Sequence, residues 1–102
     1  MTDERVECRT PTPGKSGTTR IPKWKYDCIH DAIIDAVGSA GADGFAWDDL
    51  TDAVRVRLSP DQLANMGSLG WHTVSVKLNM EVQRELRRVE GAKPQRLVLC
   101  VA

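Results

Sequence analysis

The stretch from Trp71 to Glu90 constrains the fold more than any other part of the sequence, because its twenty residues contain no glycine and no proline. Between Val74 and Val82 every second residue is apolar, which is the pattern of a half-buried strand. A strand of this length would be unusual, however, and residues 79–88 are rich in amino acids that favour helices. We therefore predict a helix over residues 71–88, with a strand over residues 74–82 as the alternative that would overturn the fold.

The clearest helical pattern lies upstream, between Pro22 and Val37, where proline in the first turn and Gly38 after the last turn mark the ends. Asp27, Asp31 and Asp35 form a stripe on one side, which we interpret as a solvated face and not as a metal site. The segment is predicted to be an amphipathic helix, because apolar residues recur at spacings of three and four at Ile29, Ala32, Ile33, Ala36 and Val37.

Two further helical segments are expected before residue 71. Leu50, Val54 and Leu58 fall at helical spacing, so we predict a second helix over residues 47–58. Ser59 followed by Pro60 has the composition of a helix N-cap, which predicts a short helical turn that ends near Met66.

The C-terminal part of the chain has the pattern of a β-hairpin. Residues 86–90 and 96–101 both carry apolar side chains, and Gly91 and Pro94 lie in the turn signal between them. Three main helices followed by a hairpin is the element order of a winged helix, an α+β fold that usually places its third helix in the major groove of DNA. We predict a winged-helix-like domain over residues 21–102.

Residues 1–20 are predicted to be a flexible arm, because they are polar and rich in proline and glycine. A short strand over residues 6–9 and extended chain over residues 18–21 are the regular structure expected there. Gly14-Lys15-Ser16 is the core of a nucleotide-binding loop, but Arg9 stands where that signature requires glycine. Nucleotide hydrolysis is therefore not expected.

Charge is unevenly distributed along a chain whose 14 basic and 14 acidic residues cancel. Residues 21–58 hold four lysines or arginines against seven aspartates, whereas residues 84–96 hold five basic residues against two glutamates. No overall field attracts such a protein to a polyanion, so contact with nucleic acid is expected only at the basic C-terminal region.

One functional hypothesis is a DNA-binding module. Trp71 and His72 follow Gly70 at the start of the predicted third helix, where a phosphate can approach the backbone closely. The residues predicted to face the groove or to contact phosphates are Trp71, His72, Ser75, Lys77, Asn79, Arg84, Arg87, Lys93 and Arg96. The alternative is a protein-interaction module that binds a protein partner or a second copy of itself, which the neutral net charge favours.

No catalytic, metal or cofactor site is predicted. No cysteine or histidine pair has metal-ligand spacing, and no nucleophile with its base can be assigned, so we expect that the protein is not an enzyme. Cys8, Cys28 and Cys100 suit neither a disulfide framework nor a zinc ribbon, which predicts free thiols. The sequence has neither a long apolar run nor a secretory signal, so we expect a cytoplasmic protein with no membrane partner.

Three groups of residues form a recognisable pattern, namely Thr18-Thr19-Arg20-Ile21, Lys25-Tyr26, and Gly70-Trp71 followed by Ser75-Val76, Leu78 and Glu81. This pattern resembles a small uncharacterised bacterial domain family, in which a Thr-Thr-Arg-Val segment precedes a helix and Gly-Trp-Trp precedes Thr-Val-x-Leu-x-Leu-Glu. The resemblance covers about residues 9–99. It implies a winged-helix-like fold and carries no established activity.

The sequence departs from that family pattern at three positions. His72 replaces the second tryptophan, Ala46 replaces a threonine that caps a helix, and Arg84 replaces a glycine that closes the third helix. Loss of a helix cap costs about 1 kcal/mol. Without the glycine, the third helix is expected to run past residue 84.

Overall fold

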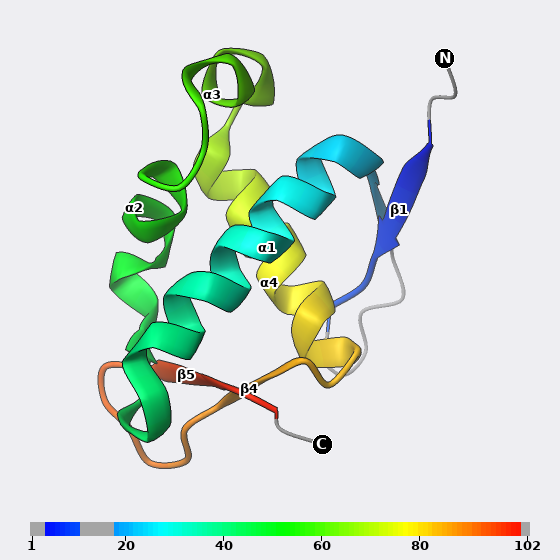
Figure 1. Cartoon of the computed structure of the whole chain (residues 1–102). Helices are drawn as coiled ribbons and strands as arrows, with labels where there is room; N and C mark the ends of the chain where they lie inside the picture. The colour runs from blue at the N-terminus through cyan, green and yellow to red at the C-terminus, as the bar shows by residue number, and fades with distance from the viewer. Residues whose placement is uncertain (1–3, 11–17, 101–102) are drawn as a thin grey trace.

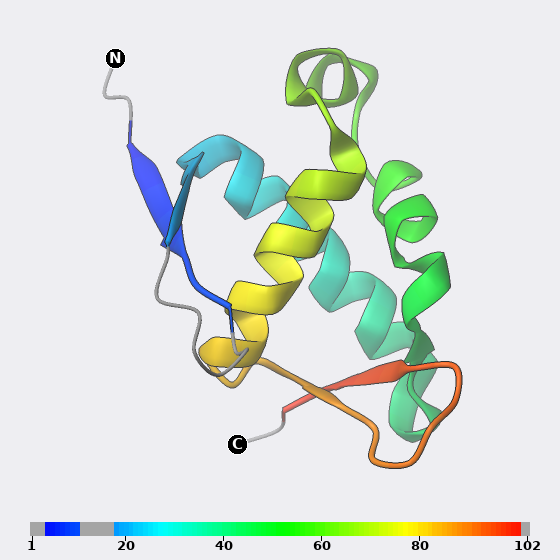
Figure 2. The same cartoon turned by 180° about the vertical axis from the view of Figure 1, so that it is seen from behind.

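One central helix, α1 (Lys23–Ala40), organises the structure, because most of the other elements pack against it. The computed structural model describes residues 4–10 and 18–100, and Figures 1 and 2 show it from opposite sides. The other elements are β1 (Arg5–Cys8), β2 (Thr19–Pro22), the 3₁₀ turn η1 (Gly41–Asp43), β3 (Phe45–Ala46), the 3₁₀ turn η2 (Trp47–Asp49), α2 (Leu50–Arg55), α3 (Pro60–Met66), α4 (Leu69–Val82), β4 (Leu86–Arg88) and β5 (Arg96–Leu99).

Helix α1 confirms the amphipathic pattern of the sequence. Ile29 and Ile33 are fully buried on one side of the helix, and Asp35 is exposed on the other. The end predicted at Gly38 is wrong, because the helix continues past this residue and closes at Gly41, whose φ is 67°. A glycine within a helix keeps its hydrogen bonds, whereas a residue with positive φ turns the chain away from the helix.

The stretch that decides the fold is helical, so the strand considered over residues 74–82 is wrong. Helix α4 packs against α1, α2, β1 and β4, which together cover much of its circumference. Val76 and Met80 are fully buried, Leu78 is half-buried, and Val74 is exposed. The alternating apolar pattern therefore reflects a helix with neighbours on several sides, not a strand with one buried face.

Helix α4 ends earlier than predicted, at Val82 and not at residue 88. Arg84 adopts a left-handed conformation with a φ of 61°. Its N–H donates to the carbonyl of Glu81 at 3.1 Å, and the N–H of Glu85 donates to the carbonyl of Met80 at 2.8 Å. These two bonds form a Schellman motif, so the helix closes here even though arginine replaces the glycine that usually occupies this position.

The helical segments in the middle of the chain are shorter and more numerous than predicted. The helix expected over residues 47–58 consists of η2 followed by α2, which ends at Arg55. Ser59 caps α3, because its hydroxyl accepts from the N–H of Gln62 at 3.1 Å and the Gln62 side chain accepts from the N–H of Ser59 at 2.8 Å. The described residues therefore contain four α-helices instead of the three main helices expected.

The described part of residues 1–20 belongs to a two-stranded sheet. β1 and β2 pair in antiparallel register, with Val6 opposite Ile21 and Cys8 opposite Thr19. They lie within one residue of the short strand expected over residues 6–9 and the extended chain expected over residues 18–21. Cys8 is buried in the core, so the short strand expected within the arm packs against the rest of the domain. Residues 1–3 and 11–17 of that arm lie outside the described residues.

The predicted C-terminal hairpin is present and belongs to a three-stranded sheet. β4 and β5 pair with Arg87 opposite Val98, and β3 pairs with the other edge of β5, which gives the strand order β3-β5-β4. We call the β4–β5 hairpin, residues 86–99, the wing. The domain is therefore α+β, with four α-helices and two small sheets among the residues that the structure describes, and the wing lies beyond the C-terminal end of α1 (Figure 1).

One buried hydroxyl group of α4 has no hydrogen-bond partner among the described residues. Thr73 is fully buried and its Oγ1 forms no hydrogen bond with any described residue. A buried polar group without a partner costs about 1–3 kcal/mol, and valine has nearly the same shape as threonine. We expect Thr73→Val to raise the free energy of unfolding by about 1 kcal/mol, measured by thermal denaturation. A loss of stability would mean that the hydroxyl is satisfied.

The left-handed residue that closes α4 generates a second prediction. A non-glycine residue in this conformation costs about 1 kcal/mol, so Arg84→Gly should stabilise the protein by roughly that amount. Urea denaturation measures the change. The matched control is Gln83→Gly, because Gln83 has a φ of −79° and glycine there loses about 0.5–1 kcal/mol through chain entropy. Equal effects of the two variants would contradict the assignment of strain to Arg84.

Candidate nucleic-acid interface

The outward side of α4 carries an uncharged strip of side chains. Trp71 and Val74 are 50% and 37% exposed, and Ser75 and Leu78 beside them are half-buried. Residues three and four apart lie on the same side of a helix, so these four residues, which we call the α4 strip, run along one face. Figure 2 shows α4 crossing the front of the molecule, between the β1–β2 sheet and α2.

His72 is engaged in closing the first turn of α4. Its ring Nδ1 lies 2.6 Å from the carbonyl oxygen of Ser68, and its ring stands edge-on to the Trp71 ring with 4.9 Å between the centroids. A nitrogen that faces a carbonyl oxygen carries the proton, so Nδ1 donates and Nε2 is left for other contacts. The hydroxyl of Ser68 completes the cap by accepting from the N–H of Trp71 at 3.2 Å.

Two of the residues predicted to contact nucleic acid are buried. Lys77 is 2% exposed. The amide of Asn79 donates to the Tyr26 hydroxyl at 2.8 Å and accepts from the N–H of Arg9 at 3.0 Å. The placement follows from helix geometry, because position 77 lies one turn after position 73 on the inner side of α4. Lys77 and Asn79 are therefore not part of the candidate interface.

The buried Lys77 ammonium joins α4 to η2 and to the wing. It lies 4.5 Å from the centre of the Trp47 ring, 2.9 Å from the Glu81 carboxylate and 3.5 Å from the side-chain oxygen of Gln95. Glu81 also pairs with Arg88 of β4 at 2.7 Å. Burial lowers the pKa of Lys77, while the hydrogen bond and the charge of Glu81 act in the opposite direction. This cluster fixes the position of the wing against α4.

The wing and the turn before it carry exposed cations on different sides. Adjacent residues of a strand point to opposite faces, so Arg87 and Arg96 lie on one face of the wing and Arg88 on the face that meets α4. Lys93 lies in the turn between β4 and β5, and Arg84 lies just before β4. Within the described part of the chain, the side chains of Arg84, Arg87 and Lys93 have no hydrogen-bond or ion-pair partner. The sequence analysis counted Arg88 among the basic residues of 84–96 but not among the predicted contacts, and the structure shows that it lies beside α4, paired with Glu81.

A histidine of α1 holds the base of the wing. Nε2 of His30 lies 2.6 Å from the carboxylate of Glu85, and Nδ1 lies 3.3 Å from that of Asp31. Burial lowers the pKa of His30, but its hydrogen bonds and charge interactions with Glu85 and Asp31 outweigh this effect and raise the pKa above its ordinary value of 6.5. Glu85 is thus paired with α1 and not with Arg84, Arg87 or Lys93.

Several exposed acidic residues lie together over α1, η2 and α2, namely Asp31, Asp35, Asp48, Asp49 and Asp52. The wing itself carries one exposed acidic residue among the described residues, Glu90, between β4 and β5. Arg57 pairs with Asp35 at 2.7 Å, and Arg55 pairs with Asp52. The neutral net charge of the chain therefore conceals an acidic surface over α1 and α2 and a basic wing.

The described residues show neither a metal cluster nor a membrane span. Between residues 4–10 and 18–100 no group of three or more His, Cys, Asp or Glu side chains is placed to hold a metal ion. No α-helix in this part of the chain combines the length and the apolar character that crossing a membrane requires. Cys8, Cys28 and Cys100 are free, which confirms the prediction that they form no disulfide.

Comparison with known proteins places the chain in one family. A model of a family of unknown function, DUF6958, matches residues 5–97. This match agrees with the uncharacterised domain family that the sequence pattern resembles. Comparisons with curated proteins and with solved structures gave no match.

The contact between His30 and Glu85 predicts a pH dependence of stability. Because the folded state raises the pKa of His30, the pair stabilises the protein fully below the ordinary pKa and loses its effect as the pH rises through the folded-state pKa. We expect His30→Gln to destabilise the protein more at about pH 5.5 than at about pH 8.5. Denaturant unfolding of both proteins at the two pH values measures this difference, and an equal loss at both would contradict it.

Proposed function

The chain belongs to the DUF6958 family of unknown function, and we propose that it is a winged-helix module that binds double-stranded DNA mainly through backbone phosphates. The order of the elements supports this fold, because α1, β3, three further helices and the wing follow one another as in a winged helix. The strand order β3-β5-β4 also places the short strand β3 on the edge of the wing sheet. Helix α3 is then an additional short helix before the recognition helix, α4.

The observation that carries the proposal is the set of exposed cations on the wing. Arg87 and Lys93 project from it without an acidic partner in the described part of the chain, and Arg88 lies beside α4. Arginine and lysine at a DNA surface release condensed counterions, and this release supplies much of the affinity of a phosphate contact. The wing therefore positions the domain on the duplex backbone.

The α4 strip determines what the domain does in the groove. Between residues 69 and 82 the basic side chain, Lys77, is buried, so α4 brings no positive charge to the bases. The Nε2 of His72 is a polar group left for base edges, and Trp71 and Val74 are suited to apolar contact with thymine methyl groups. We therefore expect weak sequence preference and strong dependence on salt.

A protein partner is the second candidate, and the exposure of Trp71 and Val74 on neighbouring turns favours it. Tryptophan is enriched among the residues that dominate protein interfaces. In that case the α4 strip forms the centre of the interface and the wing cations lie at its rim, where they contribute little to affinity.

Titration of a labelled mixed-sequence duplex at low salt tests the proposal. We expect binding whose affinity falls steeply between about 50 and 200 mM salt, and we expect Arg87→Ala with Lys93→Ala to lower the slope of log K against log salt by about 0.9 per lost phosphate contact. The control is Arg55→Ala, because Arg55 is exposed on α2 and paired with Asp52.

Absence of duplex binding at low salt would refute the DNA proposal, and a wing variant that binds like the control would refute the assigned surface. If the wild-type protein instead self-associates or captures a partner, and Trp71→Ala abolishes this association without changing the fold, the protein-interaction candidate is supported. Sizing chromatography and circular dichroism measure these two properties.

A further inference from the structure

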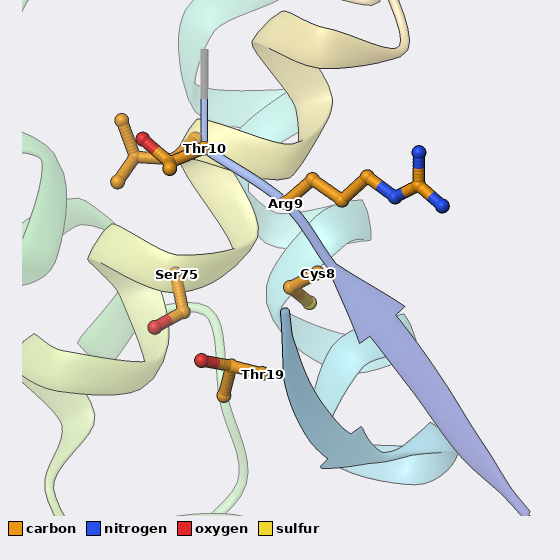
Figure 3. Close-up of a pocket in the computed structure, with 6 residues that line it drawn as sticks. Cys8, Arg9, Thr10, Thr19 and Ser75 are labelled. Carbon is orange, nitrogen blue, oxygen red and sulfur yellow. The ribbon is translucent and has the colours of Figure 1, made fainter. Parts of the chain in front are cut away.

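A small pocket lies between the β1–β2 sheet and α4, next to the α4 strip. It has a volume of about 90 Å³ and is lined by Cys8, Arg9, Thr10, Thr19, Ser75 and Leu78. Figure 3 shows the strand residues on one side and Ser75 of α4 on the other. The volume corresponds to about three water molecules at roughly 30 Å³ each, which is room for one tetrahedral oxyanion.

Two hydroxyl groups face this pocket without a protein partner. In Figure 3 the oxygens of Ser75 and Thr19 turn toward the same space, and neither forms a hydrogen bond with a described residue. A serine within a helix commonly donates to a carbonyl of the preceding turn, as Ser39 does to Ala36 at 2.7 Å. Ser75 does not, so its proton is available to a ligand.

The walls of the pocket are held in place by the core. The N–H of Arg9 donates to the side-chain oxygen of Asn79 at 3.0 Å, and the same Asn79 donates to Tyr26 at 2.8 Å. The end of β1 is thereby fixed to α4 by an amide that is itself buried. A pocket with fixed walls does not have to be ordered when a ligand binds, which favours binding.

The charge around the pocket suits an anion. None of the described residues that line it is acidic, and the exposed Arg9 lies at its rim with its side chain extending outward in Figure 3. Burial raises the pKa of the Cys8 thiol to about 11. The thiol therefore stays protonated at neutral pH and places no negative charge in the pocket, nor does it offer the thiolate that a soft metal ion needs.

We propose that this pocket binds a single phosphate group, with the hydroxyls of Ser75 and Thr19 donating to its oxygens and Arg9 providing the positive charge. The inference rests on the proposed function, because a phosphodiester of the bound duplex is the source of that group. The wing is then one surface that contacts the DNA backbone. The β1–β2 sheet, on the flank of α4, is a second one (Figure 2). This site does not require the complete nucleotide-binding loop signature, in which Arg9 stands where glycine is needed. Hydroxyl groups from two separate elements bind the phosphate instead.

Titration of the full chain with inorganic phosphate, followed by ¹H–¹⁵N NMR, tests the pocket directly. We expect saturable shifts at the amides of residues 8–10, 19 and 75–78. Ser75→Ala combined with Thr19→Val should weaken phosphate binding at least about tenfold, since each hydrogen bond to a charged group contributes appreciably. Thr73→Val is the matched control, because it removes a hydroxyl from the same helix that does not line the pocket.

Duplex titrations of the same variants separate this inference from the proposed function. Loss of duplex affinity in the Ser75 and Thr19 variant, with the Thr73 control unchanged, supports both. Phosphate shifts in the pocket without any duplex binding support the pocket and refute DNA as its source. Duplex binding that is equal in all variants, or phosphate shifts confined to the wing, overturns the pocket and leaves the DNA proposal standing.

Discussion

The arrangement of the domain depends on one buried charge, the ammonium group of Lys77. A charge withdrawn from water costs several kcal/mol unless its partners are in place, and here the partners come from three elements. Trp47 of η2, Glu81 of α4 and Gln95 of the wing all contact it. The wing is therefore not an independent hairpin, because its displacement would remove Gln95 from the Lys77 ammonium and leave that buried charge with fewer partners. Its register against α4 is set by electrostatics as well as by apolar packing.

Local signals in the sequence were sufficient to predict most helices and the hairpin, but not the features that depend on contacts with distant residues. The N-cap at Ser59, the amphipathic stripe of α1 and the hairpin around Gly91 depend on nearby residues, and the structure confirms each of them. The end of α4 was misplaced because arginine at position 84 gives no local stop signal, and its left-handed conformation is imposed by the Schellman bonds and by the contacts of β4.

The candidate site was harder to predict, because it depends on contacts between distant segments. Lys77 has the composition of a surface residue, and the sequence does not reveal that Trp47 and Gln95 enclose it. The pocket at Ser75 was missed for the same reason, since Thr19 lies far from it in the sequence and becomes its neighbour only when β1, with β2 paired to it, packs on α4. The glycines around Trp71 were the local signal, and they indicate the end of α4 where the strip is most exposed.

The separation of charge between the α1–α2 surface and the wing affects how the domain approaches a partner. A molecule with 14 charges of each sign experiences little net force in the field of a polyanion, but its separated charges experience a torque. If the proposed duplex is the partner, this torque turns the wing toward the phosphates and the aspartates of α1 away from them. Such a charge distribution orients the protein relative to a polyanion but does not provide the long-range attraction of a net positive charge. The protein therefore dissociates readily from anionic surfaces that it meets by chance.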